Sequence, residues 1–289
     1  FKQFDFTAGM EIEKTSTLKL DGPRKAIKKI STQINTDWRP VTWSATGETP
    51  LKQVVWGGYG IVAPGGNGFS EYDSFVHLDV KDKWVMVLRY MPEEISPERR
   101  QHLSRHSSLR YKAMILRDKG AAGMIVISGP QSNVKEQLIS IRFDASASST
   151  SLPVISVTDE MAELLLCPKR GKDCKSLKKL QETLDDGSIQ MGFPTSFQLS
   201  AQIDLKKEKR TGRNVLGVLK SDLPNKEPPL IVGGHVDHLG KEGGSSSLAR
   251  EEEKGKIHFG ADDNASGVAS ILEMAEWLEY QKQQGKLEM

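Results

Sequence analysis

The sequence has little of several features that mark special classes of protein. Among 289 residues there are 2 cysteines, 6 histidines and 7% aromatic residues, while 40 Lys plus Arg nearly balance 38 Asp plus Glu. The formal net charge of +2 is too small for the basic face of a nucleic-acid-binding protein or for attraction to an anionic membrane. No run approaches the ~18 to 20 apolar residues that span a bilayer. We therefore expect no nucleic-acid partner and no membrane span in this chain.

The two cysteines, Cys167 and Cys174, are too few and too far apart for a zinc knuckle. They form either a local disulfide around a glycine-containing loop or two unpaired thiols. A disulfide would indicate an oxidising compartment. On that reading we expect a secreted or periplasmic protein.

The length favours two domains with an α/β fold, residues 1–195 and residues 196–289. The first region has short apolar runs cut by Gly, Pro and Ser clusters, which predicts a β-rich structure with few helices. Residues 54–62 read as a strand interrupted by glycines, and residues 84–89 as a strand buried on both faces.

Residues 107–120 have helical apolar spacing and end at Gly120, and buried strands are predicted at 122–128 and 152–157. Strand, helix and strand then form a right-handed crossover. The segments "VKDKWVMVLRY", "SLRYKAMILRDKGAAGMIVIS" and "SLPVISVT" resemble a protease-associated domain over about residues 54–157. That resemblance implies a non-catalytic β-rich module that flanks a protease and helps to select substrates.

The second region has the strand, loop and helix order of an open mixed or parallel sheet. The sequence predicts strands at 197–205, 214–219 and 230–235, the last as a central strand, and a hairpin turn at the basic cluster 206–210. An amphipathic helix is predicted from 265 to about 283, with Asp263 or Asn264 as its cap.

Two short segments carry the chemistry, "HVDH" after the predicted central strand and "GADDNASG" at the helix start. Ligands of open α/β sheets bind beyond the carboxyl ends of the strands, so both segments should face one crevice. Imidazole and carboxylate are both zinc ligands, and a His-x-Asp pair can put one group on the metal and the other behind the imidazole. His238 is interpreted as an ordinary satisfied polar residue.

The segments "GGHVDHLG" and "GADDNASGVASILEMAEWL" resemble the di-zinc aminopeptidase family, which includes bacterial leucyl aminopeptidases and, more distantly, glutamate carboxypeptidases. The resemblance implies that His235 binds one zinc, that Asp263 rather than Asp262 bridges two zinc ions, and that Asp237 is the catalytic partner that orients His235. It implies an aminopeptidase that releases amino-terminal residues from peptides through a hydroxide activated by the two zinc ions.

The same family uses a Glu-Glu pair and a last histidine after the bridging aspartate, and this chain has no histidine after Asp263. The Glu93-Glu94 and 251–253 acidic runs read as solvated loops. We therefore expect a peptidase domain truncated at Met289, whose missing remainder is its partner, and no activity from this chain alone. The alternatives are a non-catalytic binding or structural protein with a peptidase-like fold, and a carboxypeptidase of the same superfamily.

Overall fold

The computed structural model describes residues 1–23, 31–66, 68–132, 134, 136–141, 150–166, 176–188, 191–220, 228–240 and 256–287. The protein is mixed α/β. It forms two compact units, one of Asp5–Arg210 and one of Phe1–Phe4 with Thr211–Met289. Among the described helices, none combines the length and the apolar character needed to cross a membrane.

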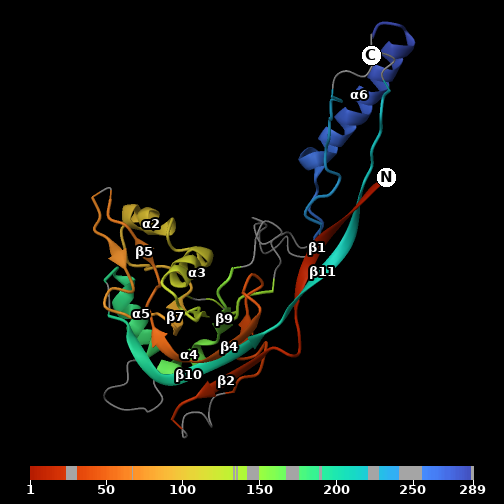
Figure 1. The fold of residues 1–289 in the computed structure, drawn as a ribbon. Coiled ribbons are helices and arrows are strands. Elements are labelled where there is room, and N and C mark those ends of the chain that lie inside the picture. Colours follow the sequence, from red (N-terminus) through yellow and green to blue (C-terminus); the bar gives the residue numbers. More distant parts are fainter. Residues whose placement is uncertain are drawn as a thin grey trace. The chain divides into compact units, whose positions relative to one another are not determined.

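A curled seven-stranded sheet organises the unit Asp5–Arg210 (Figure 1). In spatial order its strands are β2 (Thr17–Asp21), β10 (Phe193–Ile203), β4 (Gly47–Trp56), β7 (Trp84–Leu88), β8 (Gly123–Ile127), β9 (Val154–Val157) and β3 (Trp38–Pro40). The four strands β4, β7, β8 and β9 are parallel. The outer strands are antiparallel to their neighbours, so the sheet is mixed.

The predicted strands at 84–89, 122–128 and 152–157 are confirmed as β7, β8 and β9, and every residue of the three strands is buried. Helix α3 (Leu109–Asp118) connects β7 to β8, and its first turn is capped by Ser108, whose hydroxyl accepts from the Tyr111 amide at 3.3 Å. The helix stops before Gly120, which has a φ of 75°. Glycine adopts that left-handed conformation without a steric penalty.

Helices cover both faces of this sheet. Side chains of successive strand residues point to opposite faces, so each strand contributes to two cores. One core joins α3 to the sheet, through Ala113, Leu116, Val85, Val87, Met124 and Val126. The other joins α4 (Asp159–Leu166) and α5 (Leu177–Asp185), through Leu165, Leu180, Leu184, Met86, Ile125 and Ile155.

Three short helices that the sequence analysis did not identify, α2 (Pro97–Ser104), α4 and α5, accompany α3 in this β-rich region. Each is only 8 or 9 residues long. Local signals were nevertheless present: Ser96 precedes Pro97 and accepts from the Arg99 amide, and Ser176 caps α5. Serine caps and a proline in the first turn favour a helix start.

The glycine-interrupted strand predicted at 54–62 ends as β4 at Trp56 and resumes as the short β5 (Val62–Ala63), which pairs with β6 (Tyr72–Asp73). The alternating strand predicted at 197–205 is confirmed as β10.

The basic cluster 206–210 is not a hairpin turn but part of β11 (Leu205–Asn214), which forms a two-stranded sheet with β1 (Lys2–Ile12). Its residues are charged yet extended, because exposed strand positions tolerate charge. The strand predicted at 214–219 is also wrong beyond its first residue, since residues 215–220 have no regular structure.

In the unit that contains Thr211–Met289, residues 228–240 are exposed and have no regular secondary structure, so the predicted central strand 230–235 is wrong. A strand requires a neighbour for its backbone hydrogen bonds, and within the described part of this unit the segment 228–240 has none. The predicted helix is confirmed as α6 (Ser266–Gln283). Its cap is neither Asp263 nor Asn264, because an irregular turn, η2 (Ala261–Ala265), precedes it and no side chain caps it.

The predicted boundary between residues 195 and 196 falls within β10, whose strand neighbours β2 and β4 belong to the sheet described above. Residues 196–210 thus lie with the first unit. Cys167 and Cys174 lie outside the described residues, so their pairing stays a prediction.

Candidate metal centre

The histidines of the candidate site come from the extended segment 228–240. Gly234, His235 and His238 of this segment approach the turn η2 and the start of α6. A β-carbon on Gly260 would lie 2.7 Å from Cγ of His238, and one on Gly234 would lie 3.0 Å from Cδ1 of Ile271. Glycine at both positions therefore permits the close approach of two segments that the sequence predicted to share a crevice.

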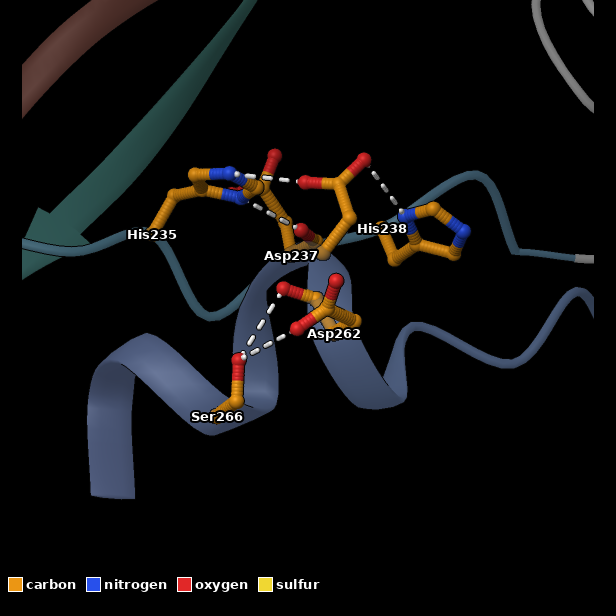
Figure 2. A network of polar contacts seen from close by, with 6 residues as sticks. His235, Asp237, His238, Asp262 and Ser266 are labelled. Atoms are coloured by element: carbon orange, nitrogen blue, oxygen red, sulfur yellow. Dashed lines mark hydrogen bonds and ion pairs between the residues drawn. The ribbon is translucent and has the colours of Figure 1, made fainter. Parts of the chain in front are cut away.

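The two aspartates of η2 have different surroundings. The Ser266 hydroxyl donates to the Asp262 carbonyl oxygen at 3.1 Å and lies 3.2 Å from its carboxylate oxygen Oδ1 (Figure 2). Asp263 has non-helical backbone angles, φ −120° and ψ 80°, and its carboxylate faces the histidines instead. The irregular turn thus separates one aspartate that holds the helix start from one that is available to a ligand.

His235 and Asp263 are brought together. Nε2 of His235 lies 3.1 Å from Oδ1 of Asp263, and both side chains are more than half exposed, at 53% and 72%. Nδ1 of His235 lies 2.9 Å from the main-chain carbonyl oxygen of Asp237 (Figure 2). A carbonyl can only accept, so Nδ1 carries a proton and donates to it. The other ring nitrogen, Nε2, faces the Asp263 carboxylate.

Asp237 reaches His235 chiefly through its backbone. Its carboxylate oxygen Oδ1 is 3.8 Å from Nδ1 of His235, beyond hydrogen-bond distance, and its side chain is 93% exposed. The carbonyl oxygen of the same residue instead accepts a hydrogen bond from Nδ1 of His235. An acceptor behind a histidine fixes its tautomer and ring orientation, whether it is a carboxylate or a carbonyl.

His238 also approaches the aspartate, which the sequence analysis missed. Its Nδ1 lies 3.6 Å from the second carboxylate oxygen of Asp263, Oδ2, and its side chain is only 22% exposed. The two oxygens of Asp263 therefore face two different imidazoles. The signal that could have found His238 is its position three residues after His235 in a segment shared with Asp237.

The donors present fit part of a zinc site. Two ligands bound tetrahedrally to one zinc at ~2.0 to 2.1 Å lie about 3.3 Å apart, close to the 3.1 Å between His235 and Asp263. A zinc ion between this imidazole nitrogen and this carboxylate oxygen would be bound by both groups. A complete zinc site needs at least three protein ligands, and no group of three metal-ligating side chains occurs in the part of the chain that the structure describes.

Comparison with known families gives the family of this segment. Residues 214–289 match Peptidase family M28. Over this segment the chain is similar to the M28 peptidases. M28 proteins are metallopeptidases, typically zinc-dependent, and they include both aminopeptidases and carboxypeptidases. The M28 match contains His235, Asp237 and Asp263, and a search among curated proteins finds no match to the chain.

Three further groups of side chains were considered from the sequence, Glu93 with Glu94, the run 251–253, and His258. Glu93 and Glu94 belong to the unit Asp5–Arg210, where the Glu94 amide donates to the carbonyl of Asp185. The run 251–253 lies outside the described residues. His258 is tied by its amide to the carbonyl of Gly240 at 2.8 Å.

Proposed function

We propose that the chain carries the first metal ligands of a zinc-dependent aminopeptidase that releases amino-terminal residues from peptides. The observation that carries this proposal is the 3.1 Å separation of Nε2 of His235 from Oδ1 of Asp263 within a segment that matches M28. In this proposal His235 and Asp263 hold metal, and Asp237 orients His235. The complete centre takes two zinc ions, in keeping with the resemblance to di-zinc aminopeptidases.

Zinc, when bound, supplies the Lewis acidity that polarises the carbonyl of a scissile amide. The residues of this chain orient the side chains that would bind the metal. The Asp237 carbonyl accepts the Nδ1 proton of His235, which leaves Nε2 free to bind metal. The divergent oxygens of Asp263, one toward His235 and one toward His238, suit a carboxylate that contacts two cations.

The other unit is proposed to contain a protease-associated domain at about residues 54–157 that helps to select peptide substrates. The buried parallel unit β7–α3–β8 supports this, because it contains the segment "KGAAGMIVIS" on which the resemblance depends. A disulfide between Cys167 and Cys174 is also proposed, and with it a secreted or periplasmic location, because such a bond persists in an oxidising compartment.

The chain by itself is proposed to be inactive. Its only carboxylates after Asp263 are Glu273, Glu276, Glu279 and Glu288, and no histidine follows. A Glu-Glu pair that could provide a general base is therefore missing from the segment where the family resemblance places it. Incubation of the purified chain with zinc and a leucyl anilide should give no turnover. If turnover occurs at an enzymatic rate, blocking the amine or the carboxylate of a peptide distinguishes aminopeptidase from carboxypeptidase.

Zinc titration tests the ligand assignment directly. We expect His235→Ala and Asp263→Ala each to weaken zinc binding at least ~10-fold. Even the loss of a residue that only supports a metal ligand weakens metal binding ~10- to 100-fold. Asp262→Ala is the matched control, because Asp262 contacts Ser266 and should change zinc affinity less than about twofold. Equal affinity in all three variants would remove the metal assignment.

A non-catalytic binding or structural protein is the second candidate function. It is favoured by one observation, that the described residues do not bring three metal-ligating side chains together. Zinc content separates the two candidates. About two zinc ions per molecule of the full-length protein, dependent on His235, support the peptidase, whereas a full-length protein without zinc supports the binding protein.

A further inference from the structure

A pocket lined mainly by polar residues lies within the unit Asp5–Arg210, far from the M28 segment in sequence. Its volume is about 430 Å³, and its polar walls are Thr36, Arg39, Glu136, Gln137, Ser140 and Thr158. Thr158 follows the last residue of β9, and Arg39 lies in β3, the strand paired with β9. The pocket is therefore at the carboxyl end of a parallel strand, where open α/β sheets bind ligands.

The wall 136–140 is held in a fixed position by hydrogen bonds. Gln137 and Asp159 are joined twice: the Gln137 amide nitrogen Nε2 donates to Oδ2 of Asp159 at 3.1 Å, and the Asp159 backbone amide donates to Oε1 of Gln137 at 2.8 Å. The Ser128 hydroxyl donates to the Gln137 carbonyl at 2.8 Å. The Ile139 amide donates to the Ser156 hydroxyl at 3.2 Å. A wall fixed by four such bonds is preorganised for a ligand.

Arg39 is the one cation among the residues that line this pocket, and part of its hydrogen-bonding capacity is unused. One guanidinium nitrogen, Nη2, donates to the carbonyl of Leu138 at 3.1 Å. Its Nε is buried and has no hydrogen-bond partner among the described residues. Burial lowers the pKa of Arg39, and the charge of Glu136 acts in the opposite direction. A carboxylate ligand would compensate this guanidinium, because its planar fork matches a carboxylate.

Glu136 gives the pocket a second charge of opposite sign. It is exposed and lines the same pocket as Arg39, but no ion pair joins the two side chains in the described structure. Hydroxyl groups of Thr36, Ser140 and Thr158 add neutral donors and acceptors. A ligand with one carboxylate and one nearby ammonium group would satisfy both charges at once.

We propose that this pocket binds a free α-amino acid as its zwitterion, with the carboxylate at Arg39 and the ammonium group at Glu136. The volume is within the range of small-molecule sites. The inference does not depend on peptidase activity, because all lining residues belong to the unit Asp5–Arg210.

The test uses the full 289-residue chain labelled with ¹⁵N, and three probes of similar size: L-alanine, N-acetyl-L-alanine and L-alaninamide. Each is titrated while the Arg39 Nε–H signal and the amides of 136–140 are followed by NMR. We expect L-alanine to shift these signals saturably. We expect the two probes that lack one charge to bind at least about tenfold more weakly, since each loses a charged hydrogen bond.

Two variants assign the charges to their residues. Arg39→Met should weaken L-alanine binding at least about tenfold, and Glu136→Gln should weaken it while making N-acetyl-L-alanine and L-alanine nearly equal. The matched control is Arg105→Met, which removes an exposed arginine outside the pocket and should leave binding unchanged.

If Arg39→Met disturbs the fold, Arg39→Lys, which keeps the charge but loses the planar fork, and the exposed Glu136→Gln decide the matter. Equal binding of the three probes, or L-alanine binding that neither Glu136→Gln nor an Arg39 variant weakens, would overturn the proposal.

Discussion

The unit Asp5–Arg210 and the unit that contains Thr211–Met289 place their apolar side chains in opposite ways. The first buries whole strands and their covering helices in two cores. In the second, none of the described residues is buried, and Leu230, Ile231 and Phe259 are 86–91% exposed. The first unit is therefore stabilised by apolar burial, whereas the candidate metal site of the second is held by a few local polar contacts.

Matched leucine substitutions in two helices test whether apolar burial stabilises the first unit more than the second. Leu116 in α3 is fully buried, and Leu272 in α6 is 62% exposed. We expect Leu116→Ala to lower the free energy of unfolding by ~2 to 5 kcal/mol, because it removes buried methyl groups and leaves a cavity. Leu272→Ala should change it by no more than ~0.5 kcal/mol. Urea denaturation of both variants measures the difference, and similar costs would contradict it.

Matched glycine substitutions sharpen the comparison at the level of packing. A β-carbon on Gly123 in β8 would lie 2.3 Å from the Trp84 ring, whereas one on Gly217 meets nothing within 4 Å. Gly123→Ala should therefore destabilise by ~1 to 3 kcal/mol through overpacking. Gly217→Ala should stay within ~0.5 kcal/mol. Thermal denaturation followed by circular dichroism compares them, and a neutral Gly123→Ala would show that the core around Trp84 adapts freely.

The pH dependence of stability should originate in the first unit. Lys112 in α3 is fully buried, and its ammonium group donates to the carbonyls of Leu88 and Tyr90 at 2.8 and 2.6 Å. Burial nevertheless lowers its pKa from 10.5 to about 7. Between these values the unfolded chain binds more protons than the folded one, so stability rises as pH rises, by at most ~1.4 kcal/mol per unit.

The variant Lys112→Met removes this titrating group while keeping the length of the side chain. Between pH 7 and about pH 9.5 the wild type should gain stability relative to Lys112→Met, as measured by urea denaturation at each pH. A difference between the two proteins that stays constant over this range would mean that Lys112 keeps its ordinary pKa in the fold.

Local patterns were sufficient to predict much of the fold. The apolar runs of β7, β8 and β9 and the helical periods of α3 and α6 gave elements whose bounds lie within a few residues of those observed. Each depends on residues close in the sequence. The prediction failed at 230–235, where an apolar run indicated a strand but strand formation requires a neighbour that no local pattern specifies.

The candidate sites show the same division. His235 and Asp263 meet as the two motifs and their family resemblance predicted, although the central strand expected to carry His235 is absent from the described residues. His238 was missed, since its approach to Asp263 depends on the irregular backbone of η2. The pocket of Arg39 and Glu136 carries no motif at all. It exists because β3 pairs with β9, and this pairing joins residues distant in the sequence.

The smallest expected change in stability, and the one that completes the comparison, is at Asp263. Its side chain is 72% exposed and faces His235 and His238 rather than a core. Asp263→Asn keeps the shape but removes the charge that a shared cation requires. We expect the unfolding free energy without zinc to change by no more than ~0.5 kcal/mol. The extra stability that zinc gives the wild type should fall in the variant, because the stabilisation by a ligand decreases as its dissociation constant rises. A large loss of stability in the metal-free variant would mean that the His235–Asp263 contact holds the fold instead of preparing a metal site.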